Sequence, residues 1–238
     1  MKTFLKLFIV FFALAGATSL SGQERRGGIG FFEAGVGMPF SSKVETRLQS
    51  VGLLGANFLF DNPGLHFGGR GFGMFNRFMI GGGGYATTMT GTNSAGEATL
   101  GVGAGFFNFG YKFVDRERTL AYVFGGIGGG GGNLRIKNTG GVTMAFAANQ
   151  QIPSGENRLI NGGGFGFEAG MGINHLIIRK DDDEGGYGGF MLGLIAGVNY
   201  FPSGTWMFEA NETNVSGLGN LSSFYIGITI GGGSFENN

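Results

Sequence analysis

Side chains alternate between apolar and nearly absent along several segments of this chain, and this alternation limits the folds open to it. In the segment FGFEAGMGINHLII, 165–178, every odd position up to Ile173 is apolar, whereas the even positions hold glycine, Glu168 and Asn174. An extended strand directs alternate side chains to opposite faces, so this segment has one apolar face and one nearly bare face. The same period of two recurs at 31–40 and 188–201, which predicts β-strands rather than helices.

The alternation predicts eight strands, and a helical spacing predicts one helix. The strands are expected at 28–40, 64–75, 77–91, 96–114, 119–137, 163–180, 187–202 and 222–233. The helix is expected within SKVETRLQSVGLL, 42–54, because Val44, Leu48 and Val51 have the spacing of one helix face. This helix would lie inside the first connection, between the first and second strands.

The fourth predicted strand contains an irregularity. From Leu100 to Phe106 the even positions are apolar and oppose glycine, but from Phe107 to Phe113 the apolar residues occupy the odd positions. One inserted residue would keep all these apolar side chains on the same face of the strand. The sequence therefore predicts a β-bulge between Phe106 and Phe107.

The lengths of the connections alternate along the chain. The connections after the odd-numbered strands are mostly long and cover 41–63, 92–95, 138–162 and 203–221. Those after the even-numbered strands are short and cover 76–77, 115–118 and 181–186. In an up-and-down meander successive connections lie at opposite ends, so this order gathers the long loops at one end, as in membrane barrels. The predicted fold is all-β: a closed antiparallel up-and-down β-barrel of about eight strands, with one short helix in the first long loop.

The amino terminus and the composition indicate where the chain is located. Lys2 and Lys6 precede an apolar run at 7–15 and then small residues up to Gly22, which is the order of a cleaved secretory signal peptide. We therefore expect a signal peptide at 1–22 and a transmembrane β-barrel domain at 23–238. The absence of cysteine from the sequence excludes disulfides and thiol nucleophiles. Lys plus Arg and Asp plus Glu number 16 each, so no net positive charge favours nucleic acid as a partner.

The chain resembles small bacterial outer-membrane barrels of the eight-stranded OmpA/OmpX kind, and more closely glycine-rich barrel proteins of Bacteroidota type without an assigned activity. The resemblance covers 28–233 and rests on the signal peptide, the alternation, and glycine-rich strand segments at 77–88 and 124–136. It implies insertion into the outer membrane by the barrel-insertion machinery, contact with outer-membrane lipid, and a monomer. The implied role is structural, adhesive or that of a small pore, and not that of an enzyme.

A membrane setting assigns the two faces of each strand. The apolar parity would face lipid, and the glycine-rich parity would face the lumen, where glycines either leave a narrow cavity or allow another element to approach closely. Glu33 and Glu168 have the inward parity, and Arg70 is expected to share it. Because buried charges must be paired, Glu33, Arg70 and Glu168 are predicted to form a charge cluster in the lumen. A proton or ion path through the same residues is the alternative.

No catalytic, metal or cofactor site is expected. His66 and His175 are the only histidines, they lie on strands far apart in the sequence, and His175 has the outward parity, so neither a zinc pair nor a histidine-based triad is expected. The glycine-rich segments 81–85 and 125–132 lack the following helix and the Lys-Ser/Thr pair of a phosphate-binding loop.

Two other function classes stay open. A soluble secreted or periplasmic barrel that binds a small apolar ligand, as lipocalins do, would direct its apolar side chains inward and polar ones outward. An enzyme in the membrane would need a Ser/His/Asp-type or paired-acid site near a rim of the barrel. The sequence does not decide whether the lumen conducts, or whether the segment 41–54 plugs it.

Overall fold

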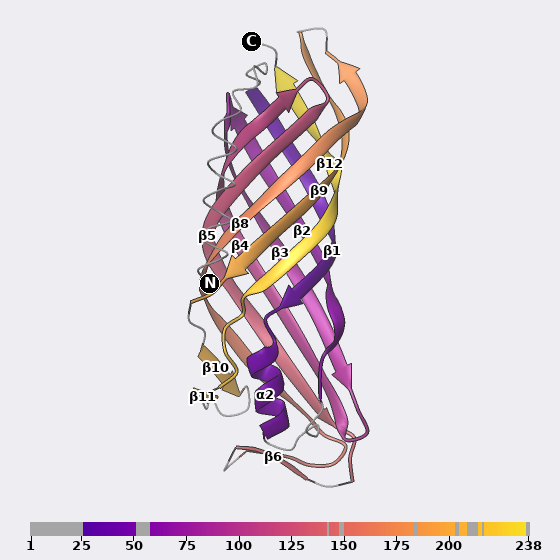
Figure 1. Ribbon diagram of the computed structural model, residues 1–238, viewed down its shortest axis with the longest axis vertical. Coiled ribbons are helices and arrows are strands. Elements are labelled where there is room, and N and C mark those ends of the chain that lie inside the picture. Colours follow the sequence, from indigo (N-terminus) through magenta and orange to yellow (C-terminus); the bar gives the residue numbers. More distant parts are fainter. Residues whose placement is uncertain are drawn as a thin grey trace.

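Eight long strands form the wall of a barrel, whose arrangement Figure 1 shows. The computed structural model describes residues 26–50, 58–141, 143–147, 150–182, 185–202, 205–208, 214–215 and 217–236. The predicted signal peptide lies outside the described residues. The wall strands are β1 (Arg26–Pro39), β2 (Asp61–Phe75), β3 (Phe78–Thr92), β4 (Gly96–Arg116), β5 (Thr119–Asn138), β8 (Asn157–Asp181), β9 (Gly186–Tyr200) and β12 (Ser223–Glu236).

The wall strands make a continuous hydrogen-bonded ring. Each pairs antiparallel with the preceding and following wall strand, and β1 pairs with β12 from Arg26↔Glu236 to Pro39↔Ser223. Every wall strand therefore has two partners, as a barrel requires. The predicted fold class is confirmed, and the predicted strands correspond one to one with the eight wall strands.

The connections collect at the two ends of the barrel as predicted. The turns at 76–77 and 117–118 and the connection between β8 and β9 lie at the end that also holds the carboxyl terminus of the barrel. The opposite end, called the long-loop end below, carries helix α2 (Ser42–Ser50) (Figure 1). The helix was predicted for 42–54, of which 51–54 lies outside the described residues.

The long-loop end also contains four short strands that the sequence did not predict. They are β6 (Met144–Ala147), β7 (Gln150–Ile152), β10 (Thr205–Phe208) and β11 (Asn214–Val215). β6 and β7 form a hairpin of their own, whereas β10 pairs with β8 between Ile160 and Gly163 and with β11 on its other side. β10 thereby continues the wall next to β8, beyond the point where the pairing of β8 with β9 ends at Phe167. Among the residues that the structure describes, no helix is both long and apolar enough to cross a membrane.

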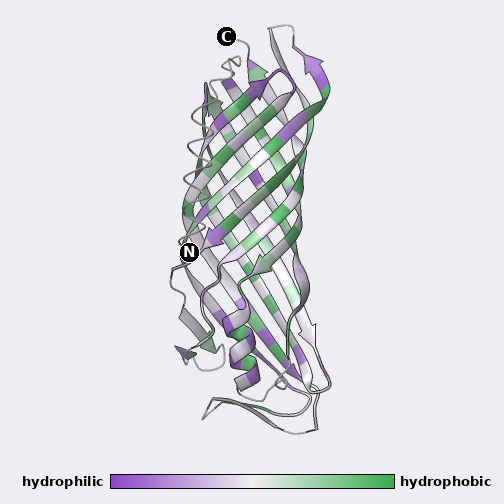
Figure 2. Cartoon of the chain, in the orientation of Figure 1, coloured by the Kyte–Doolittle hydropathy of each residue, from purple (hydrophilic) through white to green (hydrophobic). Residues whose placement is uncertain are grey.

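The outer wall is apolar along most of the barrel, as the alternation predicted. Phe165 and Phe167 on β8, Leu194 on β9 and Ile228 on β12 are all exposed, whereas Glu168 is buried. Figure 2 shows hydrophobic residues spread along the wall strands, with hydrophilic residues gathered on α2 and near the strand ends. The faces predicted for β1, β8, β9 and β12 are those observed.

The predicted β-bulge in β4 is wrong. Pairing of β4 with β3 continues without a break from Tyr111 to Glu97, and the pairing with β5 shifts only between Lys112 and Val114. The apolar parity changes at Phe106 because the contents of the lumen change there. Leu100 and Phe106 point inward and are buried, so the prediction that they face outward with Phe107 is also wrong.

Side chains fill the lumen in layers. At the long-loop end, Val44 and Leu48 of α2 pack on an apolar core with Leu100 of β4, Leu134 of β5 and Trp206 of β10. A second apolar core lies toward the other end and includes side chains of β2, β5, β9 and β12. Since an eight-stranded barrel is just wide enough for side chains to fill it, these two cores close the lumen at two heights, and α2 helps to plug the long-loop end.

Inward glycines accommodate aromatic rings from the neighbouring strands. A Cβ atom on Gly172 would lie 2.5 Å from the ring of Tyr122, and one on Gly197 would lie 2.5 Å from the hydroxyl oxygen of Tyr225. In both cases the glycine and the tyrosine are directly paired across two strands. The bare parity therefore leaves no empty cavity at these positions, because rings lie against the wall where side chains are missing.

We expect Gly172→Ala to destabilise the barrel by about 1–3 kcal/mol, because the added methyl group overpacks the contact with Tyr122. The control is Gly69→Ala on the outer wall, where the nearest atom to a Cβ is 3.6 Å away. Alanine there removes chain entropy from the unfolded state and should be neutral or stabilising by up to about 1 kcal/mol. Urea unfolding in detergent micelles measures both, and equal losses would contradict the packing described for Tyr122.

Candidate functional site: a charged network in the lumen

Register places the three predicted charged residues on the inner wall at similar depth. On β1 and β2, Phe31 pairs with Arg70 and Glu33 pairs with Gly68, so Glu33 and Arg70 are diagonal neighbours on the inward face. Glu168 lies on β8, which is not adjacent to β2 in the ring, and it reaches Arg70 across the lumen. The structure thus brings together Glu33, Arg70 and Glu168, whose side chains are almost fully buried.

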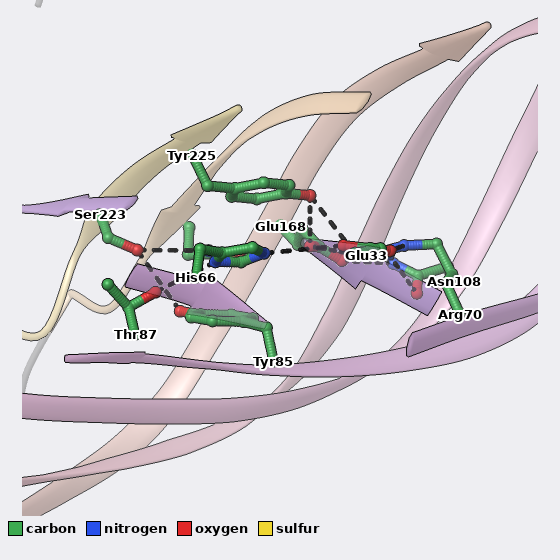
Figure 3. A network of polar contacts seen from close by, with 10 residues as sticks. Glu33, His66, Arg70, Tyr85, Thr87, Asn108, Glu168, Ser223 and Tyr225 are labelled. Carbon is green, nitrogen blue, oxygen red and sulfur yellow. Dashed lines mark hydrogen bonds and ion pairs between the residues drawn. The ribbon is translucent and has the colours of Figure 1, made fainter. Parts of the chain in front are cut away.

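Arg70 is at the centre of the network (Figure 3). Its Nε donates to Glu33 Oε1 at 2.9 Å, and its two terminal nitrogens donate to the two oxygens of Glu168 at 2.7 and 2.8 Å. The guanidinium carbon also lies 4.3 Å from the ring centre of Phe124 on β5. This arrangement is a bidentate arginine–carboxylate pair with a second carboxylate on the remaining edge, which is the strong and directional form of an ion pair.

Two uncharged side chains complete the shell around Glu168. Asn108 of β4 donates to Oε2 at 2.8 Å, and the hydroxyl of Tyr225 of β12 donates to Oε1 at 2.8 Å. Arg70 in turn donates to Oδ1 of Asn108 at 3.0 Å. Each oxygen of Glu168 therefore accepts two hydrogen bonds, which compensates the hydration that the carboxylate loses on burial.

His66 extends the network toward the long-loop end. Its ring is fully buried between the rings of Tyr85 and Tyr225, with centroid distances of 5.1 and 4.7 Å. Nδ1 lies 3.0 Å from the hydroxyl of Thr87, and Nε2 lies 3.7 Å from Oε2 of Glu33. Figure 3 shows His66 between the two tyrosines, with Glu33 at its edge.

Sequence reasoning missed His66, Asn108 and Tyr225 as members of this network. Their inward parity was readable, but parity gives only the face of a strand and not the depth at which a side chain lies. Depth depends on the register between strands that are distant in the sequence. His175, in contrast, lies on the outer wall as predicted, where Nδ1 is 3.0 Å from the hydroxyl of Thr119.

The chemistry available to this network is that of buried charge pairing. In the part of the chain that the structure describes, no group of three or more His, Asp or Glu side chains is placed to hold a metal ion. Apolar cores lie on both sides of the network along the lumen. The network links all eight wall strands. Phe124 of β5 lies under the guanidinium of Arg70. Asn199 of β9 donates a hydrogen bond to the hydroxyl of Ser223 of β12, and this hydroxyl lies 3.4 Å from the hydroxyl of Tyr85 of β3.

Two solved structures of outer-membrane proteins are similar to this chain. One is Ail, the attachment invasion locus protein of Yersinia pestis, with 10% identity, a TM-score of 0.40, and coverage of 90% of this chain and 99% of Ail. The other is the outer membrane protease OmpT from Escherichia coli, with 10% identity, a TM-score of 0.35, and coverage of 89% and 97%. No family model and no curated protein matches the sequence. Because both TM-scores are below 0.5, the fold of this chain rests on its own strand pairing.

Proposed function

We propose that this chain is a bacterial outer-membrane β-barrel protein with a structural or adhesive role, delivered by a cleaved signal peptide and without catalytic activity. The observation that carries the proposal is the distribution of side chains about the wall. Large apolar side chains are exposed on the outer face of all eight wall strands, whereas Glu33, Arg70 and Glu168 are buried inside. Water on the outside would oppose this arrangement, and lipid on the outside would favour it.

The facing of the side chains argues against the soluble alternative. A soluble ligand-binding barrel would direct Phe167, Leu194 and Ile228 into the lumen, but these side chains are 45%, 57% and 50% exposed on the outer wall. The lumen at this height holds an ion-pair network and aromatic rings instead of a ligand cavity.

Toward the long-loop end, polar side chains lie on the outer face of the wall and apolar side chains on the inner face. This reversal supports an adhesive role. On β5, the outward residues Asn133, Arg135 and Lys137 are exposed, whereas the inward residues Leu134 and Ile136 are fully buried. A polar exterior over an apolar core is what a water-exposed structure requires. The strands at this end therefore extend beyond the lipid, and they present a polar wall and the long loops on the cell surface.

The proposed location is tested by fractionation and by gel migration. We expect recovery in the outer-membrane fraction and a shift in detergent gels between unheated and boiled samples, because a closed hydrogen-bonded ring resists unfolding until it is heated. Recovery in the soluble periplasm, with no such shift, would refute the membrane role.

The same structure disfavours the small-pore role. Among the described residues, two apolar cores and the Arg70 network occupy the lumen, and such layers oppose the passage of ions. We expect the refolded protein to show no single-channel conductance in a planar bilayer. A bilayer that conducts with the wild-type protein would show that these layers open, and it would restore the pore as a function.

A further inference from the structure

The carboxylates of the lumen network outnumber its guanidinium. Two carboxylates, Glu33 and Glu168, share one guanidinium, that of Arg70. Glu168 uses both oxygens in four hydrogen bonds, whereas Glu33 receives only the Nε of Arg70 on Oε1. Within the described part of the chain, Glu33 Oε2 is buried and has no hydrogen-bond partner. An uncompensated carboxylate oxygen in such a place is costly, so a proton or a positive partner must compensate it.

A second group with an unsatisfied polar atom, His66, faces this oxygen. Its Nε2 is also buried without a hydrogen bond, and it lies 3.7 Å from Glu33 Oε2. One proton on Nε2 satisfies both atoms at once, as a donor for the imidazole and as a compensating charge for the carboxylate.

The surroundings of the ring suit an imidazolium. The two tyrosine rings that enclose His66 are nearly parallel to it, at 25° for Tyr85 and 4° for Tyr225. Both centroid distances fall within the range of about 6 Å over which the face of an aromatic ring attracts a cation. The hydroxyl of Thr87, 3.0 Å from Nδ1, can accept the second ring proton.

We propose that Glu33 and His66 hold one exchangeable proton between them, carried on Nε2 of His66. The network then contains two carboxylates, one guanidinium and one imidazolium, and is electrically neutral. Five titratable or charged groups lie around His66 of β2. They are Glu33 of β1, Arg70 of β2, Tyr85 of β3, Glu168 of β8 and Tyr225 of β12. Loss of the proton leaves one unpaired negative charge in a network that links all eight wall strands, which makes the network a proton-sensitive element of the barrel.

The sequence allows a direct test, since His66 and His175 are the only histidines. Nitrogen-15 NMR of the folded protein in micelles at about pH 8 distinguishes protonated from neutral rings, and an ordinary exposed imidazole is neutral under this condition. We expect both nitrogens of His66 to carry protons in the wild-type protein. A neutral His66 in the wild-type protein at this pH would overturn the proposal.

Substitution identifies the partner. Glu33→Gln keeps the size of the side chain and removes its charge, and we expect His66 to become neutral in this variant at the same pH. The control is Glu97→Gln, which removes a carboxylate from the outer face of β4 and should leave His66 protonated. A protonated His66 in Glu33→Gln would refute the assignment to Glu33. If Glu33→Gln does not fold, the wild-type spectrum still decides whether the proton is present.

Discussion

Arg70→Ala is expected to destabilise the barrel by about 3–5 kcal/mol. Removal of the guanidinium leaves Glu33 and Glu168 buried without their shared cation, and loss of one partner from a buried ion pair carries a cost of this size. Urea unfolding in detergent micelles measures the change in the free energy of unfolding. The control is Arg135→Ala on the exposed outer face of β5, which should change this free energy by no more than about 0.5 kcal/mol.

A double-mutant cycle separates the ion pair from the packing of the arginine stem. In a Glu33→Gln background one of the two unpaired carboxylates is already neutral, so Arg70→Ala should cost less than it does in the wild-type protein. We expect a coupling of about 0.5–3 kcal/mol between the two positions. Additive effects would show that the 2.9 Å contact between Arg70 and Glu33 contributes nothing to stability.

Leu194→Arg is expected to destabilise the inserted barrel by about 2–4 kcal/mol. Leu194 lies near the middle of β9 on the outer wall, is 57% exposed, and is paired with Ile173 of β8 and Ile228 of β12. In the proposed outer-membrane location, an arginine side chain at this height would enter the hydrocarbon of the membrane. Unfolding titrations in lipid vesicles measure the loss.

The control for this prediction is Asn133→Arg. Asn133 also lies on the outer wall, but it belongs to the polar segment of β5 near the long-loop end. We expect this substitution to change the free energy of unfolding by about 0–1 kcal/mol, which is the cost of an arginine near the interface between membrane and water. Equal effects at Leu194 and Asn133 would show that the change of polarity along β5 does not mark the edge of the membrane.

The wall of the barrel could be predicted closely from the sequence. Alternation with a period of two predicted all eight wall strands, and the order of long and short connections predicted how they are arranged. Both signals are local, because a strand that faces two different environments must alternate, and a two-residue turn at 76–77 can join only adjacent antiparallel strands. The largest deviation in a boundary is at β8, which starts at Asn157 and not at 163 because its first residues pair with β5 and β10.

The irregularity in β4 could not be interpreted from the sequence alone. An apolar parity that changes at Phe106 is compatible with a bulge and with an uninterrupted strand that passes from one environment to another. Because β4 pairs with β3 without interruption, the strand has no bulge at Phe106 and passes from one environment to another. The choice depends on what fills the lumen, and the filling side chains, such as Leu48, Phe58 and Trp206, come from connections distant in the sequence.

By itself the sequence determined the faces of β1, β8, β9 and β12 and the need for a partner at each buried charge. Glu33, Arg70 and Glu168 could be predicted together because a charge on an inward parity must be compensated, whatever the register. Only the tertiary structure decided the rest: that Arg70 divides its hydrogen bonds unequally between two carboxylates, that tyrosine rings occupy the space beside inward glycines, and that His66 faces the free oxygen of Glu33. The physical reason is that parity is a property of one strand, whereas depth and contact depend on the register of the whole closed ring.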